Sequence, residues 1–510
     1  MRRFFFSIWM LLTVWFTNVA FSQNLPITRE EFNETRQTLI KSKQKMLKQR
    51  LLMKSTLTSP AQNNFDVTYY KLNLNIDPTL EQISGAVEMT AQAKINNFTT
   101  VELDLFSNMS VDSVSGDADS FIHTDDILQI QLAQARQSGE TFTVRVAYHG
   151  RPASSGFGSF GFNYHNDIPI IWTLSEPYYA RSWWPCKDTP NDKADSVDMI
   201  VTVPENLITA SNGNLLQDIN NGDGTRTFHW HESYPITTYL VSLAITNYAT
   251  YSELFHYSPD DFMQVQYYIY PEDLAKAKSQ LTETIAMLTY FHEIFGPYPF
   301  LTEKYGIAQF PWGGGMEHQT ITSQRGFGKT LTVHELAHQW WGDKITNANW
   351  HDIWLNEGFA SYAEALYYEH RDGKEFYHTY MGWMDWDFPF AIYVDDTTSV
   401  KRIFHGTVYD KGAWFLHMLR HVVGDSTFFD ILLSYSQDPR FAYGNATTAG
   451  FQSVCEAVSG QDLDWFFQPW IYEKGRPIYQ AVWSTRDSIG NNLLNLNIKQ
   501  IQYPKQPVFS

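Results

Sequence analysis

Three residues in this sequence have the types and spacing of a metal-dependent hydrolase. His334 and His338 lie four positions apart, and Glu335 follows the first of them. No proline or glycine occurs between Lys329 and Gly342, which favours a helix that places both imidazoles on one face. Glu335 then lies beside the metal axis, where its carboxylate can reach a metal-bound water without binding the metal. The spacing therefore predicts a zinc site with a general base.

Glu357 is the candidate for the third ligand of the same ion. It lies nineteen positions beyond His338, at the head of a second segment with helical periodicity. Catalytic zinc takes three protein ligands and keeps one position open, so His334, His338 and Glu357 predict one zinc ion per chain. Glu364, seven residues later on the same helix face, is either a hydrogen-bond partner of a ligand histidine or a surface carboxylate.

An ordinary buried helix is the alternative for this segment. Its two histidines would then be satisfied by carbonyl groups and would bind no ion.

The composition is that of a large folded protein. The 510 residues are 43% hydrophobic and 16% aromatic, which is ample for sizeable packed cores. The formal net charge of -18 argues against nucleic acid or an anionic membrane surface as a partner. The charge says nothing about the chemistry.

Residues 1–22 have the pattern of a secretory signal. Two arginines precede the apolar run Phe4 to Phe16, and Ala20-Phe-Ser22 is a small-x-small cleavage site. We therefore expect a secreted or periplasmic protein with no transmembrane segment after signal removal, and anchoring by an uncleaved signal is the alternative. Cys186 and Cys455 lie far apart, and we expect two buried thiols rather than a disulfide.

Residues 23–60 predict a helical extension. Thr28 and Glu31 have the spacing of a capping box, and the basic segment that continues to about Lys54 lacks glycine and proline. We expect one exposed helix whose charges form a solvated face.

Residues 61–251 predict a β-sandwich domain. Short runs of alternating apolar and polar residues are separated by clusters of Asn, Gly and Asp. The loop from Glu176 to Pro190 stands apart, because its aromatic and charged residues do not alternate. Loops of that kind usually carry recognition.

Residues 252–477 mix strands with long helices and contain the metal motif. The glycines 313–315 before the motif fit a strand only where another backbone approaches closely, and a plain glycine turn is the alternative. Residues 478–510 hold two alternating runs, too few strands to bury a face, and predict the start of an incomplete β domain. The predicted class is thus a multidomain α+β protein.

Five motifs in one order extend over roughly Phe65 to Pro477. They are the loop Glu176 to Pro190, the strand Gly314-Gly-Met-Glu317-His318, His334-Glu-Leu-Ala-His338-Gln-Trp, Asn356-Glu357-Gly-Phe-Ala, and Tyr409-Asp-Lys-Gly412-Ala. In these motifs the chain resembles the gluzincin zinc aminopeptidases, the family that includes membrane alanyl aminopeptidase and leukotriene hydrolase.

The resemblance implies a β-saddle domain followed by a thermolysin-like catalytic domain. It also implies that Gly314, Gly315 and Met316 bind the substrate backbone by β-augmentation and that Glu317 holds the free α-ammonium. Glu176 falls at the position that shares this task, and Tyr409 falls at the position that stabilises the oxyanion. His318 departs from the family pattern, which commonly has Asn there.

Taken together, these observations predict a zinc aminopeptidase that hydrolyses the first peptide bond of peptides with a free N-terminus. One alternative is a thermolysin-like zinc endopeptidase, which would leave Glu176 and Glu317 without a purpose. A second is a non-catalytic zinc protein that binds peptides, and a third is epoxide hydrolysis as in the leukotriene branch.

Overall fold

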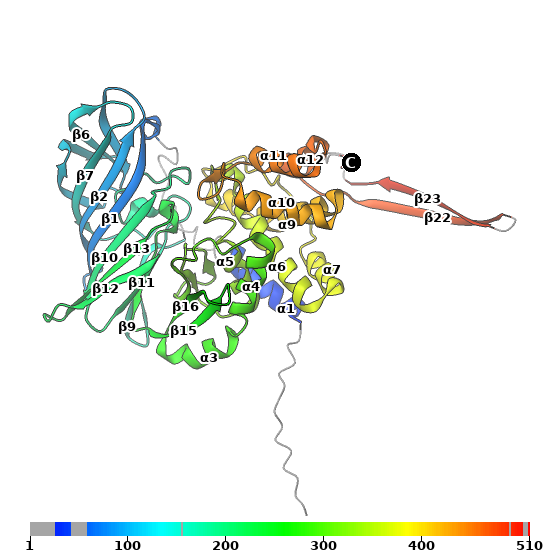
Figure 1. Ribbon diagram of the computed structural model, residues 1–510, viewed down its shortest axis with the longest axis horizontal. Coiled ribbons are helices and arrows are strands. Elements are labelled where there is room, and N and C mark those ends of the chain that lie inside the picture. The colour runs from blue at the N-terminus through cyan, green and yellow to red at the C-terminus, as the bar shows by residue number, and fades with distance from the viewer. Residues whose placement is uncertain (1–25, 42–58, 155–156, 489–490, 503–507, 510) are drawn as a thin grey trace, which may run out of the picture.

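The computed structural model describes residues 26–41, 59–154, 157–488, 491–502 and 508–509. The predicted signal, residues 1–22, lies outside the described residues, as does the part of the predicted N-terminal helix between 42 and 54. In Figure 1 strands fill the left side, helices lie in the middle, and a two-stranded hairpin extends to the right. One apolar core runs through the strand-rich half and the helical half of the protein. Among the described residues, no helix is long and apolar enough to cross a membrane.

The first half is built on a large sheet in the order β12-β13-β10-β1-β2-β7-β4. Its strands are β1 (Phe65–Asp77), β2 (Gln82–Ala93), β4 (Met109–Gly116), β7 (Thr141–Gly150), β10 (Ser196–Pro204), β12 (Asn214–Asn220) and β13 (Thr225–Glu232). Tyr70, Leu72, Leu74 and Ile76 of β1 are buried while the residues between them are not, so the predicted alternation is present.

Two smaller sheets complete this half. One has the order β3-β6-β5 and the other the order β11-β14-β9-β8. Their strands are β3 (Phe98–Asp104), β5 (Ala118–Thr124), β6 (Ile127–Arg136), β8 (Ser159–His165), β9 (Ile168–Leu174), β11 (Ile208–Ser211) and β14 (Leu243–Thr246). The β-rich N-terminal domain that the sequence predicts is therefore present.

The second half begins with a mixed sheet in the order β15-β16-β17-β19-β18. Its strands are β15 (Ala249–His256), β16 (Phe262–Ile269), β17 (Lys304–Gln309), β18 (Gly315–Met316) and β19 (Thr322–Gln324). β18 is the edge strand of this sheet, and it pairs antiparallel with β19. A separate short pair joins β20 (Thr346–Asn347) to β21 (Asn445–Ala446) in parallel.

Helices make up the rest of this half. They are α3 (Leu274–Gln280), α4 (Thr284–Phe295), α5 (Lys329–Ala337), α6 (Trp354–Asp372), α7 (Lys374–Trp383), α8 (Val400–Ile403), α9 (Gly406–Val423), α10 (Asp425–Gln437), α11 (Thr448–Ser459) and α12 (Asp464–Tyr472). The mixed class, a β-rich domain followed by a helical catalytic domain, is confirmed. The predicted boundaries at 251 and 477 stay a prediction.

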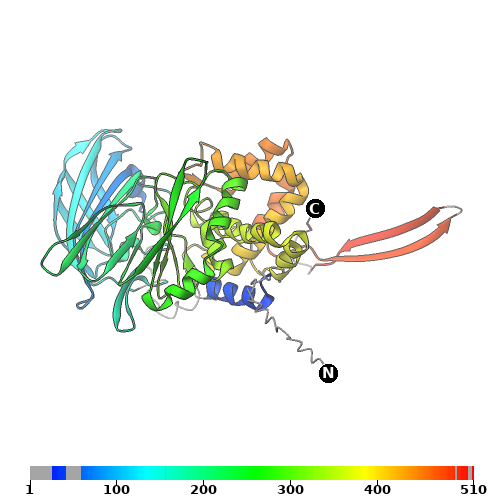
Figure 2. The same cartoon turned by 60° about the horizontal axis from the view of Figure 1, so that its bottom comes forward.

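The helix α1 (Arg29–Arg36), with its π-helical continuation Gln37–Lys41, corrects one expectation. Its capping box is confirmed, because Thr28 N donates to Glu31 Oε2 at 2.7 Å and Glu31 N donates to Thr28 Oγ1 at 3.2 Å. The prediction of an exposed helix is wrong, since Phe32, Arg36 and Leu39 are buried. These residues recur at spacings of four and three and form one face that packs on the helical domain (Figure 2).

The two cysteines are both free and buried, as predicted. Cys186 lies within the loop from Glu176 to Pro190, and Cys455 lies on α11.

A hairpin of β22 (Tyr479–Ser488) and β23 (Asn491–Gln500) projects away from the helices (Figure 1). Its register places Trp483 opposite Leu496 and Ala481 opposite Ile498, so these four residues share one face. Trp483 is 67% exposed and Leu496 is 54% exposed. The alternative that these strands pack back on the helical domain is therefore wrong.

Replacing this apolar face should reduce self-association without destabilising the protein. We expect the double variant Trp483→Ser, Leu496→Ser to aggregate less than the parent, because exposed apolar patches drive association. Its melting temperature should be unchanged, because neither side chain is packed in the core. Light scattering and thermal unfolding measure the two effects. Ile122→Ser is the control, because Ile122 is an exposed apolar residue on β5, away from the hairpin. A double variant that aggregates as much as this control would contradict the expectation.

Candidate active site

Helix α5 carries the first two candidate ligands. His334 lies in its last turn and His338 is its C-cap, still in helical conformation, so the two rings lie one turn apart. Their Nε2 atoms face each other at 3.2 Å, and the rings are nearly perpendicular. The predicted placement of both imidazoles on one helix face is therefore present.

The other ring nitrogens determine which atoms can bind a metal. His338 Nδ1 lies 2.9 Å from the carbonyl oxygen of Trp341, so it must carry the proton and donate. His334 Nδ1 lies 2.7 Å from Glu364 Oε1 and donates in the same way. Both Nε2 lone pairs are thus directed at the same point. Two roles were open for Glu364, and the structure shows it as a buried hydrogen-bond partner of His334 and not as a surface carboxylate.

Glu357 completes this group from the first turn of α6. Its Oε2 lies 3.3 Å from His334 Nε2 and 3.4 Å from His338 Nε2. The three side chains are fully or almost fully buried. Two nitrogen lone pairs and a carboxylate this close repel one another unless a cation lies between them.

Zinc fits this donor set. Two imidazoles and one carboxylate, with no fourth side chain in the group, are the ligands of a catalytic zinc site. Burial alone would lower the pKa of His338, but Glu317, Glu357 and Glu335 raise it to about 10. The site therefore has an excess of negative charge that a divalent cation would balance.

Glu335 and the glycine strand β18 are in direct contact. A Cβ atom on Gly315 would lie 2.2 Å from Glu335 Oε1, so only glycine leaves room for the carboxylate. Gly314 has a φ of +142°, and a Cβ there would lie 2.5 Å from the Trp312 ring. The prediction that another backbone approaches these glycines is therefore wrong at Gly314 and Gly315, because the close neighbours are the side chains of Trp312 and Glu335.

Glu317 lies beside the same groups. Oxygens of Glu317 and Glu335 and a ring nitrogen of His338 all lie within 4.8 Å of one another. Glu176, from the loop after β9, is buried as well. After burial, Glu317 and Glu176 are the main causes that raise the pKa of Tyr239 well above its usual value. Carboxylates from both halves of the chain therefore lie around one tyrosine.

Tyr409 reaches the site from α9. Its hydroxyl donates to Glu357 Oε1 at 2.7 Å, and its ring stacks against that of His334. A Cβ on Gly358 would lie 2.9 Å from the Cα of Gly412, so α6 and α9 touch at two glycines. This contact brings Tyr409 within reach of Glu357.

Met316 and His318 flank Glu317, with Met316 at the end of β18 and His318 beyond the strand. Met316 is buried and pairs with Ser323 of β19. His318 Nδ1 lies 2.9 Å from Ser323 Oγ. Burial lowers the pKa of His318 to about 3, so it is neutral.

Sequence reasoning missed three residues of this site. Tyr239 lies in a short turn of the first half, and Asn356 donates to its hydroxyl at 3.3 Å. Tyr380 of α7 donates to Glu364 Oε2, and Arg36 of α1 donates to Glu364 Oε1 at 3.2 Å. None belongs to a motif, and only the spacing of Phe32 and Arg36 on one helix face signalled a buried role.

Comparison with known proteins agrees with this geometry. The peptidase M1 N-terminal domain matches residues 66–240, and the peptidase family M1 domain matches residues 280–470, so the two matches cover most of the chain. The chain belongs to peptidase family M1.

Relatives within family M1 are aminopeptidases by name. Mouse endoplasmic reticulum aminopeptidase 1 is 26% identical over 73% of this chain and 45% of its own length. Aminopeptidase M1 of Arabidopsis thaliana is 28% identical over 61% of this chain and 37% of its own length. The chain thus spans less than half the length of these curated relatives.

Solved M1 structures match the fold more completely. A two-domain M1 zinc metallopeptidase with bound L-tryptophan has a TM-score of 0.73 at 26% identity, covering 82% of this chain and 96% of the other. The M1 zinc metallopeptidase of Deinococcus radiodurans has a TM-score of 0.70 at 25% identity, covering 81% and 95%. The chain therefore covers nearly the whole length of both solved structures.

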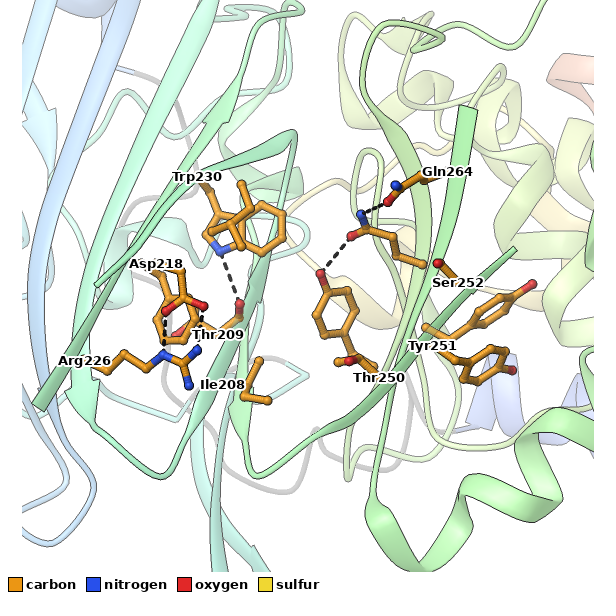
Figure 3. Close-up of a pocket in the computed structure, with 14 residues that line it drawn as sticks. Ile208, Thr209, Asp218, Arg226, Trp230, Thr250, Tyr251, Ser252 and Gln264 are labelled. Atoms are coloured by element: carbon orange, nitrogen blue, oxygen red, sulfur yellow. Dashed lines mark hydrogen bonds and ion pairs between the residues drawn. The ribbon is translucent and has the colours of Figure 1, made fainter. Parts of the chain in front are cut away.

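A hollow of about 510 Å³ between the two halves lies apart from the M1 site (Figure 3). Several of its polar side chains bind one another, since Arg226 pairs with Asp218 and Gln266 Nε2 donates to Gln264 Oε1 at 2.9 Å. None of the metal-site residues lines it. It is not a second candidate for the chemistry.

Removing the third ligand should release zinc. We expect Glu357→Gln to lose most of its zinc on dialysis against a chelator, because a neutral amide is a weaker ligand than a carboxylate. Glu456→Gln is the control, since Glu456 belongs to a separate, more exposed acidic group with Asp462 and Asp464. Metal analysis decides, and full zinc occupancy in Glu357→Gln would count against the trio.

Adding one methyl group to β18 should displace Glu335, the predicted general base. We expect Gly315→Ala to lower kcat roughly 100-fold, because its Cβ takes the space of Glu335 Oε1 and a shift of about 1 Å can cost that much. Gly326→Ala is the matched control, since no atom lies within 4 Å of its Cβ position. Steady-state kinetics at saturating zinc measures both variants. An unchanged kcat in Gly315→Ala would show that Glu335 does not act from this position.

Proposed function

We propose that this protein is a zinc-dependent aminopeptidase that hydrolyses the N-terminal peptide bond of unblocked peptides. The observation that carries the proposal is the buried carboxylate of Glu317 beside Glu335 and His338. An M1 relative from Deinococcus radiodurans has been solved with a Tyr-Ser-Ala substrate, a peptide class that fits this arrangement.

The chemistry of bond cleavage falls to Glu335 and Tyr409. His334, His338 and Glu357 would hold a zinc ion, which would lower the pKa of a water molecule to about 7 and polarise a carbonyl group. Glu335 takes the water's proton and passes it to the leaving amine. Tyr409, whose hydroxyl already reaches Glu357, donates to the oxyanion that forms on the attacked carbonyl.

The glycine strand supplies the register of the substrate. β18 is the edge of its sheet among the described strands, so an extended peptide can add to it. Gly314, Gly315 and Met316 then bind the backbone of the peptide and lead to Glu317, next in the chain. A peptide held in this way has its first carbonyl near Glu335.

Glu317 and Glu176 recognise the α-ammonium. Glu317 Oε1 is buried and, within the described part of the chain, has no hydrogen-bond partner. A substrate ammonium would supply both the missing donor and the missing positive charge. Binding would then count residues from the N-terminus of the peptide.

The alternatives are less well supported. A thermolysin-like endopeptidase would use the same trio but would leave the buried Glu317 uncompensated in every complex. A structural zinc site would be closed by a fourth side chain. Among the described residues, the group formed by His334, His338 and Glu357 has only these three members. None of the described residues of the site supports epoxide hydrolysis.

We also propose that the protein is exported. The basic start, apolar run and small-x-small site of residues 1–22 support a secretory signal, hence a secreted or periplasmic enzyme. The apolar face of the β22–β23 hairpin supports a further β structure that covers it, in line with the expectation for residues 478–510.

We propose in addition that the catalytic half is thermolysin-like, as the resemblance implies.

Loss of the Tyr409 hydroxyl should affect kcat far more than KM. We expect Tyr409→Phe to lower kcat roughly 100- to 1000-fold, because the contact with the oxyanion exists only in the transition state. Saturating zinc separates this effect from any loss of the bond to Glu357. Tyr435→Phe is the control, since that buried hydroxyl has no hydrogen-bond partner in the described structure. A kcat for Tyr409→Phe equal to that of the control would remove the oxyanion role.

Blocking the substrate amine should abolish cleavage. We expect hydrolysis of leucyl and alanyl amides and a fall in kcat/KM of about three powers of ten or more for their N-acetyl forms, because a buried, unpaired carboxylate costs several kcal/mol. Glu317→Ala should lose a comparable amount on the free amides, and Glu293→Ala, at an exposed position of α4, should not. Fluorogenic substrates measure all four cases. Internal cleavage of an N-acetylated peptide at a comparable rate would establish the endopeptidase instead.

A further inference from the structure

Helix α1 inserts a charged side chain into the helical domain. Phe32 anchors the helix, with its ring edge-on to Tyr380 at 5.1 Å between centroids and near Trp383 at 5.5 Å. One turn later, Arg36 is only 6% exposed, and its guanidinium lies 5.5 Å from the Phe32 ring. An arginine buried to this degree needs anionic partners.

Those partners lie on the two helices that carry Glu357 and Tyr409. Arg36 Nη1 donates to Glu364 Oε1 at 3.2 Å and to Ser361 Oγ at 3.1 Å, both on α6. Its Nε lies 3.2 Å from Asp410 Oδ1 on α9, an ion pair without hydrogen-bond alignment. Arg36 therefore bridges α6 and α9 at the level of the metal trio.

The oxygen that Arg36 contacts is the one that holds a metal ligand. Glu364 Oε1 also accepts from His334 Nδ1 at 2.7 Å, and Tyr380 donates to Oε2 of the same carboxylate. Glu364 is fully buried and Asp410 nearly so. Without the guanidinium between them, two buried carboxylates would repel each other, and Glu364 would lose one of the groups that hold it against His334.

We propose that Arg36 is a positioning residue of the metal site, which holds Glu364 in place against His334. The N-terminal segment then sets the affinity of the trio for zinc, although Arg36 lies 328 positions before Glu364 in sequence. The inference rests on the proposed function in one respect, that the trio binds zinc. It adds a residue that belongs to neither of the two M1 domain matches.

Zinc affinity of the purified full chain tests this role. We expect Arg36→Met to weaken zinc binding about 10- to 100-fold, the usual loss when the partner of a metal-binding histidine is disturbed. Arg36→Lys keeps the charge without the planar fork and should lie between Arg36→Met and the parent. Arg29→Met is the matched control, because Arg29 is an exposed arginine of the same helix. Competition with a zinc indicator gives the affinities, and thermal unfolding of the metal-free proteins reports stability separately.

A merely structural clamp predicts a different result. It would lower the melting temperature of metal-free Arg36→Met and leave its zinc affinity equal to that of Arg29→Met, which would overturn the proposal. If Arg36→Met does not fold, Arg36→Gln is judged by the same criterion.

A double-mutant cycle with Glu364→Gln locates the effect. Once Glu364 is neutral, Arg36→Met should weaken zinc binding much less than it does in the parent, because Arg36 acts through that carboxylate. Equal losses in both backgrounds would overturn the proposal.

Parent measurements separate this inference from the proposed function. A parent chain that binds no zinc would remove both. A parent that binds zinc and cleaves free amides, with Arg36→Met indistinguishable from Arg29→Met, would remove the role of Arg36 alone.

Discussion

The site depends on the repulsion between three acceptor groups that the fold brings together. His334 and His338 each donate their Nδ1 proton outward, to Glu364 and to the carbonyl of Trp341, so their Nε2 lone pairs face each other at 3.2 Å. Glu357 adds a carboxylate to the same point. A buried arrangement of this kind needs a positive charge, and either a metal ion or a proton on His338 can supply it.

Close backbone contacts then place the remaining groups around that point. Gly358 and Gly412 let α6 and α9 touch, which brings Tyr409 to Glu357. Gly315 lets β18 approach Glu335, so the strand that would bind a peptide lies beside the group that would activate water. The geometry of the proposed reaction thus depends on the glycines as much as on the reactive side chains.

Much of this could be predicted because it is local in sequence. The ligand pair follows from helix periodicity, the position of Glu357 from a second periodic segment, and the glycine strand from the cost of glycine in a strand without a close neighbour. The β-rich first half follows from alternating residues, which the burial of β1 reproduces.

The rest could not be predicted, because it arises from contacts between distant segments. Tyr239 and Tyr380 belong to no motif, and nothing in their neighbourhoods separates them from other buried tyrosines. The basic composition of the N-terminal helix predicts a solvated face that includes Arg36. Its burial follows from a partner on α6 that no local pattern indicates.

The position of the metal is the most direct test of this account. An anomalous difference map recorded at the zinc absorption edge, from crystals of the zinc-loaded chain, should show one peak per chain within about 2.0–2.2 Å of His334 Nε2, His338 Nε2 and a carboxylate oxygen of Glu357. A peak at another group of side chains would contradict the account. So would a map with no peak in which His334, His338 and Glu357 bind one another directly.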